Sequence, residues 1–416
     1  MRVCTRHMLA ILLLLGTPEI TRSQTPGSEA LSLERCIAIA LEKNPLVLSA
    51  AHHHEASLAR IRQATAFPYP SLDFVSDFQP RFLNFIDAAE THFGFSQTLE
   101  FPGKRSVRGK IAERVSMEVE TDIEAVKLDL AYEVKKAFYQ LLLAQEKLRY
   151  ARSDLELSED YLRKAEEKLG AGDVAKVEVI RARVEALKAA NAIRVATNDE
   201  RVAKARLNFL LARRSTAPVE IRGQLELPFV GLDLERLKDE ALALRPEIKK
   251  LQYSIEREQW NQQSSKLSNY PDLDFSLSKA RVVGEPSSWA FTVSAPLPFL
   301  FQKRQKAEIA ESQANVAALR RDIEQNKNSI LLEVEEAFMN AETAKNQILV
   351  HRQEILPQAE EVHSMFLFSY HEGAIGGIEI IEARRTLNES RKLYADALFE
   401  YALATASLER AVGRRP

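Results

Sequence analysis

The sequence contains Tyr69-Pro70-Ser71-Leu72-Asp73-Phe74, and 201 residues later it contains Tyr270-Pro271-Asp272-Leu273-Asp274-Phe275. Other segments recur at an offset of 200 or 201: Asn44-Pro45 with Arg245-Pro246, Glu133-Val134-Lys135-Lys136-Ala137-Phe138 with Glu333-Val334-Glu335-Glu336-Ala337-Phe338, and Val177-Glu178-Val179-Ile180 with Ile378-Glu379-Ile380-Ile381. Agreement at separated places indicates a duplicated unit rather than chance similarity between helices. We therefore expect the two halves to build the same motif.

Both copies of the Tyr-Pro stretch begin a segment in which apolar and polar residues alternate. Two such segments lie within 71–101 and two within 272–298, and a period of two predicts strands with one apolar and one polar face. We expect each strand to be roughly 9 to 11 residues long, which is the length that a tilted transmembrane strand requires. The apolar positions are Leu72, Phe74, Phe78, Phe93, Phe95, Leu99, Phe101, Leu273, Phe275, Leu277, Trp289, Phe291 and Val293.

Long helices occupy most of the remaining chain. No proline interrupts residues 104–169, and apolar residues there recur every three or four positions, as in coiled coils. The glycines at 170 and 172 predict a reversal into a return helix, which gives a helix hairpin over 104–212. The second copy predicts a hairpin over 303–412, in which Pro357 kinks the helix or marks a junction. Residues 33–65 are predicted to be helical.

These segments define the expected domain organisation. Residues 1–23 are predicted to be a signal peptide, because Arg2 and Arg6 precede an apolar run that is too short to span a membrane. The first repeat then covers 24–214, with a helix, the β-hairpin 71–101 and the helix hairpin 104–212. A linker covers 215–232. The second repeat covers 233–413, with a helix, the β-hairpin 272–298 and the helix hairpin 303–412.

Composition narrows the function. The formal net charge is -2, so a nucleic-acid partner is not indicated. No internal apolar run approaches the roughly 20 residues of a spanning helix. Strands that are apolar on one face and polar on the other suit a wall between lipid and water. The lipid interior contains no water that could form hydrogen bonds with backbone amides. All backbone amides of such a sheet must therefore pair within it, so the sheet must close on itself.

Four strands cannot enclose a lumen, whereas three chains together would supply twelve. The predicted fold class is therefore mainly α with membrane β: a long-helix α-barrel joined to a transmembrane β-barrel, with four strands per protomer, closed as a trimer. The alternative is a soluble sandwich with its apolar faces turned inward. It is less favoured because hairpins joined to very long helices have no neighbouring sheet to cover them.

In order and spacing, the duplicated plan, the Tyr-Pro segments, the stretch Gln97-Thr98-Leu99-Glu100-Phe101-Pro102-Gly103-Lys104-Arg105 and the two glycine turns resemble the TolC-type outer-membrane factors. The resemblance implies an outer-membrane homotrimer that extends into the periplasm as the exit duct of an efflux system. It implies contact with outer-membrane lipid, a periplasmic adaptor and a proton-driven inner-membrane pump. Residues 101–105 are similar to those of members that export heavy-metal cations, although Lys104 and Arg105 also suit a simple anchor at lipid headgroups.

The resemblance also points to a gate. Glu379 and Glu382 share one helix face just after Gly373, where the family holds paired carboxylates around the periplasmic entrance. A threefold ring of such carboxylates would attract cations. The alternative is a solvated helix face, with Arg384 and Arg385 as neighbours. The chain departs from the family pattern in having glutamates in place of aspartates and Ile375 in place of a basic latch residue.

Other candidates are fewer. The turn tips Gly172, Asp173, Gly373 and Ala374 are the expected adaptor contacts, by resemblance. His52-His53-His54 invite a metal-site interpretation, but successive helical side chains diverge by about 100°, so a solvated patch is favoured and no metal site is predicted.

We expect no catalytic residues and no cofactor, because nucleophile motifs and phosphate-binding glycine loops are absent from the sequence. The main alternative function is a periplasmic coiled-coil scaffold without a pore. Within the transport function, the residues leave metal ions, drugs and polypeptides open as cargo.

Overall fold

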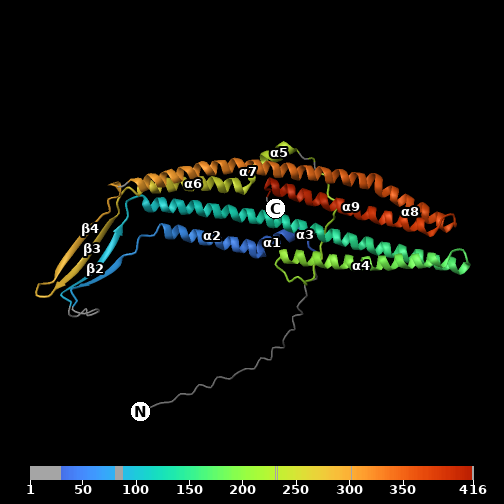
Figure 1. The fold of residues 1–416 in the computed structure, drawn as a ribbon, viewed down its shortest axis with the longest axis horizontal. Coiled ribbons are helices and arrows are strands. Elements are labelled where there is room, and N and C mark those ends of the chain that lie inside the picture. Colours follow the sequence, from blue (N-terminus) through green and yellow to red (C-terminus); the bar gives the residue numbers. More distant parts are fainter. Residues whose placement is uncertain (1–29, 80–87, 230, 232, 301, 415–416) are drawn as a thin grey trace, which may run out of the picture.

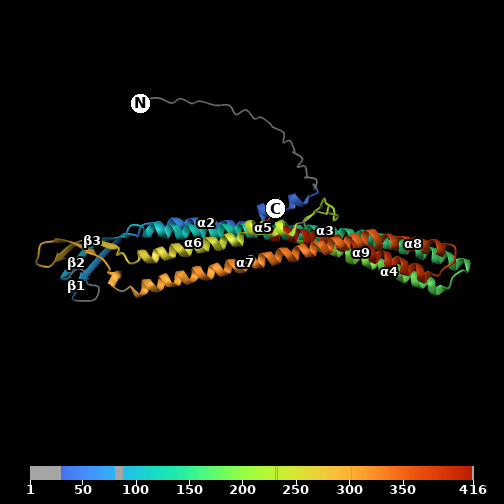
Figure 2. The ribbon, with the colours of Figure 1, turned by 90° about the horizontal axis from the view of Figure 1, so that it is seen from above.

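The protein is described by a computed structural model that covers residues 30–79, 88–229, 231, 233–300 and 302–414. The predicted signal peptide and part of the first hairpin loop lie outside these residues. Helices run side by side along the long axis, and a β-sheet lies at one end (Figures 1 and 2). Among the described helices, none combines the length and the apolar character needed to cross a bilayer.

The same order of elements occurs twice. The first half contains α1 (Leu33–Lys43), α2 (Pro45–Ala64), β1 (Ser71–Asp77), β2 (Glu90–Leu99), α3 (Lys104–Ala171) and α4 (Lys176–Leu210). The second half contains α5 (Leu234–Leu244), α6 (Pro246–Leu267), β3 (Leu273–Val282), β4 (Ser288–Ser294), η1 (Pro298–Leu300), α7 (Lys303–Val350), η2 (His351–Ile355), α8 (Leu356–His371) and α9 (Gly377–Val412).

The prediction of one helix over 33–65 was wrong at Asn44. Pro45 disfavours a helical conformation of the residue before it, and Asn44 is extended, with φ -69° and ψ 129°. Its side chain accepts a hydrogen bond from the Leu46 amide at 2.9 Å and therefore caps α2. It also donates to the Leu210 carbonyl at 2.8 Å, which ties the α1–α2 corner to the end of α4.

The four strands form one antiparallel sheet in the order β1-β2-β3-β4. The register places Leu72, Phe95, Leu277 and Phe291 in one row across all four strands. The neighbouring row on the other face is Ser71, Ser96, Ser276 and Thr292. The alternation therefore gives one apolar and one polar face, as predicted, and the apolar side chains are largely exposed in the single chain.

Two strands are shorter than predicted. β2 and β3 have 10 residues each, within the expected range, but β1 and β4 have 7 each. Both short strands lie at the sheet edges, where each has one neighbour within the described residues. Phe78 adopts φ 54°, which ends the extended conformation of β1 directly after Asp77.

The helices continue the order of the strands. Near the sheet they lie in the order α2, α3, α6, α7 (Figure 1). A Cβ on Gly109 of α3 would lie 2.7 Å from Thr65 Cγ2, so this glycine allows the end of α2 to approach α3 closely. The largest apolar core lies midway along the molecule, where α1, α3, α4 and α9 meet around Phe138, Leu141 and Leu207.

The second long helix hairpin is interrupted once. A π-helical segment, His351–Ile355, separates α7 from α8, and Pro357 occupies the first turn of α8. Proline has no amide hydrogen and its ring clashes with the carbonyl four residues earlier, so the wider turn accommodates it. The structure thus has a junction at the place where the sequence predicted one.

Candidate functional site

The two helix hairpins end at the pole opposite the sheet (Figure 1). At the first tip, Gly172 adopts φ 83°, and the Asp173 amide donates to the Lys168 carbonyl at 2.9 Å. At the second tip, Gly373 adopts φ 73°, and the Ala374 amide donates to the Ser369 carbonyl at 2.9 Å. Left-handed glycines of this kind end helices at little steric cost. The four predicted tip residues are exposed.

Just behind the tips, a cluster around Tyr370 joins the two hairpins. The Tyr370 hydroxyl donates to Glu178 Oε1 at 2.8 Å, and its side chain is almost completely buried. Lys168 donates to the Tyr370 carbonyl at 2.5 Å and lies over its ring at 4.2 Å. Burial and the hydrogen bond to Glu178 raise the pKa of Tyr370, so the hydroxyl stays protonated as a donor. The Tyr161 ring packs 5.4 Å from the Tyr370 ring.

Gly377, the first residue of α9, lies against this cluster. A Cβ at this position would lie 1.8 Å from the Tyr161 hydroxyl and 2.7 Å from Glu178 Oε1. Both distances are far inside van der Waals contact. The close packing of α9 on α3 and α4 at the tip therefore requires glycine at 377.

Glu379 and Glu382 follow on the first turns of α9, and both are exposed. Glu382 Oε1 accepts a hydrogen bond from Arg385 at 2.9 Å. Within the described residues, Glu379 has no ion-pair partner. The structure thus places the two predicted carboxylates one turn apart at the tip end, in different electrostatic surroundings.

Arg384 and Arg385 do not behave as one solvated pair. The Arg384 side chain is only 7% exposed and binds Asp154 of α3 and, at 2.9 Å, Glu185 of α4. Arg385 is about half exposed and also reaches Glu185, at 2.7 Å. Burial favours the neutral form of Glu185, but hydrogen bonds from Arg385 and Lys188 outweigh it and lower the pKa of Glu185. Charged groups thus fasten α9 to both helices of the first hairpin.

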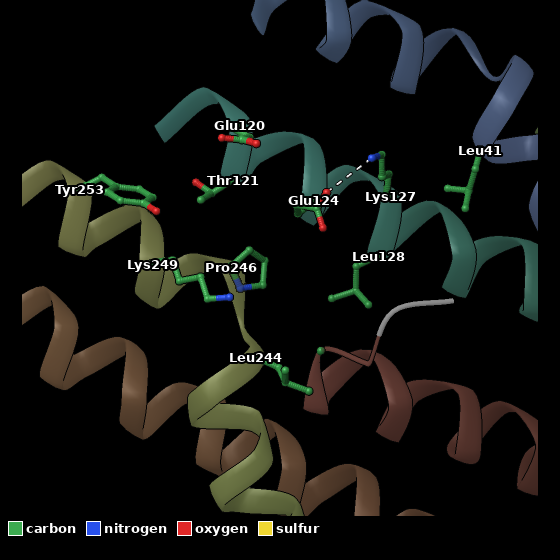
Figure 3. A pocket seen from close by; sticks show the side chains of 11 residues that line it. Leu41, Glu120, Thr121, Glu124, Lys127, Leu128, Leu244, Pro246, Lys249 and Tyr253 are labelled. Carbon is green, nitrogen blue, oxygen red and sulfur yellow. Dashed lines mark hydrogen bonds and ion pairs between the residues drawn. The ribbon is translucent and has the colours of Figure 1, made fainter. Parts of the chain in front are cut away.

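An open cavity of about 520 Å³ lies between α3 and α6 (Figure 3). Glu120 and Thr121 of α3 border it on one side, and Lys249 and Tyr253 of α6 on the other (Figure 3). Its lining mixes charged, polar and aliphatic groups, and the Thr121 hydroxyl donates to the Glu118 carbonyl of its own helix at 2.7 Å.

Of the remaining candidates, His52, Lys104 and Arg105 have local partners, whereas the buried Nδ1 of His54 has none within the described residues. His52 pairs with Glu55 at 3.0 Å on an exposed helix face. Within the described ranges, no group of three or more His, Cys, Asp or Glu side chains is positioned to hold a metal ion. Lys104 pairs with Asp272 at 2.8 Å, and the Arg105 guanidinium lies 3.9 Å from the centre of the Phe67 ring. These two cations stabilise the junction between sheet and helices.

The comparisons with known proteins identify the fold. The model of the family "Outer membrane efflux protein" matches residues 36–213 and again residues 237–414. The chain belongs to this family. It is therefore an outer-membrane efflux channel of the tripartite type, with a helical extension into the periplasm, and it belongs to a family of transporters rather than enzymes. Family membership also decides against the scaffold without a pore.

The relatives agree with this assignment. The chain is 25% identical to the cobalt-zinc-cadmium resistance protein CzcC of Cupriavidus metallidurans over 408 residues, which cover 96% of this chain and 94% of the relative. It is similar in structure to the outer-membrane channel OprN, with a TM-score of 0.76 at 18% identity, covering 92% of this chain and 89% of OprN. For CusC the TM-score is 0.75 at 18% identity, covering 92% of each chain. Channels of this family are trimers.

Sequence reasoning missed several groups at the tip. Tyr370 and Gly377 had no signal in the sequence pattern, because a tyrosine and a glycine near a turn are common. The alternative of a solvated helix face places Arg384 in solvent, whereas its side chain is buried. A buried arginine is recognisable only when its carboxylate partners are known, and Asp154 and Glu185 come from two other helices.

Proposed function

We propose that this efflux channel is a homotrimer that conducts heavy-metal cations through an entrance lined by Glu379 and Glu382. The observation that carries the proposal is the exposure of two carboxylates, one turn apart, at the end of the molecule opposite the sheet. The similarity to a cobalt-zinc-cadmium resistance protein supports the choice of cargo. A ring of carboxylates at a constriction attracts cations and repels anions.

Unpartnered apolar surfaces support the trimer. The apolar face of the sheet is exposed, and β1 and β4 each leave one edge unpaired within the described residues, as expected where neighbouring protomers complete a twelve-stranded barrel. α4 presents Val177, Ile180, Val184 and Leu187 to solvent, spaced three or four residues apart. α8 presents Val362, Met365 and Phe368 in the same way. Such stripes match the seams of a barrel of helices.

We also propose that the chain comprises two repeats, over residues 24–214 and 233–413, joined by a linker over 215–232. The repeated order of elements and the two separate matches of the family model support this division. In the linker, Ile221 forms a parallel bridge with Leu31, so this segment also ties the start of the first repeat to its end.

The partners are a periplasmic adaptor and a proton-driven inner-membrane pump. The tips at Gly172, Asp173, Gly373 and Ala374 are the candidate adaptor contacts, because they are exposed and lie farthest from the sheet (Figure 1). Cysteines at Asp173 and Ala374 should crosslink to a co-purified adaptor. Failure at both tips would contradict this assignment.

The entrance is tested by single-channel recording of the trimer in planar bilayers. Replacing both Glu379 and Glu382 by Gln should lower the preference for cations and weaken block by divalent cations. Glu167→Gln is the matched control, because it removes an exposed carboxylate from α3 near the same tip. If the double variant and the wild type have the same cation preference and the same block by divalent cations, the carboxylate ring is contradicted. Growth of a deletion strain on graded zinc, cobalt and copper, and on detergents, tests the cargo.

A further inference from the structure

A continuous chain of charge pairs leads from the candidate entrance into the protein. Glu382 at the surface of α9 accepts from Arg385 Nη1 at 2.9 Å. The same guanidinium donates through Nη2 to Glu185 Oε1 at 2.7 Å. Glu185 in turn accepts from Arg384 at 2.9 Å, and Arg384 also binds Asp154. Exposure falls along this chain, from 62% for the Glu382 side chain to 8% for Glu185.

The charges of this chain balance only when its exposed members are included. Asp154 and Glu185 carry two buried negative charges, and Arg384 carries one buried positive charge. Lys188 and Arg385 are both partly exposed and reach Glu185 at 3.0 and 2.7 Å. With Glu382 the group contains three carboxylates and three cations, and Arg385 is the cation that contacts both Glu185 and Glu382. Arg384, which is buried and held by two carboxylates, fixes this part of α9 and so presents Arg385 between Glu185 and Glu382.

We propose that Arg385 sets the charge of the entrance by acting as a built-in competitor for cations at Glu382. This inference rests on the proposed entrance function of Glu379 and Glu382. In the resting channel Arg385 neutralises Glu382, and Glu379 is the carboxylate that keeps its full charge. An arriving divalent cation binds first at Glu379 and gains Glu382 only by displacing Arg385, which then remains bound to Glu185.

Competition between Arg385 and the cation for Glu382 is compatible with conduction through a channel. Conduction requires an entrance site that attracts an ion and also releases it. Two free glutamates per protomer, gathered by threefold symmetry, would hold a divalent cation strongly. An arginine that returns to Glu382 when the ion departs weakens this binding. Arg385 is thus a positioning and specificity-determining residue, and its side chain need not bind the cargo.

The experiment measures block of the trimer by Zn²⁺ in planar bilayers, together with the reversal potential in a KCl gradient. Arg385→Gln should lower the half-blocking Zn²⁺ concentration about fivefold, the effect of losing a partly exposed ion pair, and should raise the preference for cations. Arg385→Lys should stay near the wild type, because it restores the charge. Lys188→Gln is the matched control: it removes one positive charge from the same Glu185 but lies on α4 and does not contact Glu382.

The outcomes separate this inference from the proposed function. Equal shifts in Zn²⁺ block for Arg385→Gln and Lys188→Gln, or no shift in either, would contradict the proposed competition by Arg385. If the double variant of Glu379 and Glu382 still weakens Zn²⁺ block in that case, the proposed entrance is supported and only the role of Arg385 is rejected. Should Arg385→Gln fail to assemble, the single variants decide: Glu379→Gln should weaken block more than Glu382→Gln, and the reverse order contradicts the proposal.

Discussion

Replacing Gly377 by alanine should separate the two helix hairpins at their tips. The added Cβ would lie 1.8 Å from the Tyr161 hydroxyl and 2.7 Å from Glu178 Oε1, so α9 must move away from α3 and α4. Overpacking of this kind costs about 1–3 kcal/mol. Gly377 is the first residue of α9, so alanine gains little helix propensity there. An overpacking cost of about 1–3 kcal/mol raises the separated population about 5- to 160-fold, since about 1.4 kcal/mol is a factor of ten.

Two measurements follow the separation. Hydrogen exchange of the amides in 161–178 and 370–381 should accelerate, while exchange in the core around Phe138 should not change. Single-channel conductance should rise, because the tips lie at the proposed entrance. Gly170→Ala is the matched control, because it lies close to the other tip and no atom lies within 4 Å of a Cβ at this position. If Gly377→Ala and Gly170→Ala behave alike in both assays, close packing at Gly377 does not hold the tip together.

Three further predictions test other parts of the molecule. Phe291→Asp should reduce the yield of membrane-inserted trimer, because a charge on a lipid-facing strand position is destabilising, whereas Thr292→Asp on the polar face should be tolerated in the same heat-modifiability gel. Tyr370→Phe removes the hydrogen bond to the Glu178 carboxylate, which is worth about 1.5–3 kcal/mol because the acceptor is charged, and should raise single-channel conductance as Gly377→Ala does. Burial, with Arg391 and Arg384 nearby, lowers the pKa of His363, so its protonation opposes folding. Stability should therefore fall as pH drops through the unfolded-state pKa near 6.5, and thermal unfolding of His363→Gln should lose this component.

The faces of the sheet could be predicted from the sequence because strand periodicity is a local property. The alternation predicts that Leu72 and Phe291 lie on an apolar face, and the register places them in one row. The ends of the edge strands could not be predicted, because they depend on which residues pair with a neighbouring strand. The break at Asn44 could have been found, because a residue before proline rarely continues a helix.

The surroundings of the proposed entrance residues could be predicted only in part. Exposure of Glu379 and Glu382 followed from their position on a helix face near a turn. Their different surroundings did not, because the difference depends on Arg385, and the direction of Arg385 depends on Glu185 in another helix. Sequence spacing relates groups along one helix, whereas these charges meet across three helices.

The duplication itself conceals the features that distinguish the two tips. Glu178 and Glu379 occupy equivalent positions 201 residues apart, yet Glu178 accepts from Tyr370 while Glu379 faces solvent. Arg183 and Arg384 are equivalent in the same way, but Arg183 pairs with exposed Glu166 and Arg384 is buried. In the proposed function, the second hairpin lines the entrance and the first hairpin supports it. Two copies of one sequence can take these different positions only if equivalent residues have different partners. The proposed gate therefore lies where the two copies differ. Gly377 is equivalent to Lys176, which is exposed, so the close packing that Gly377→Ala would disrupt belongs to the second copy.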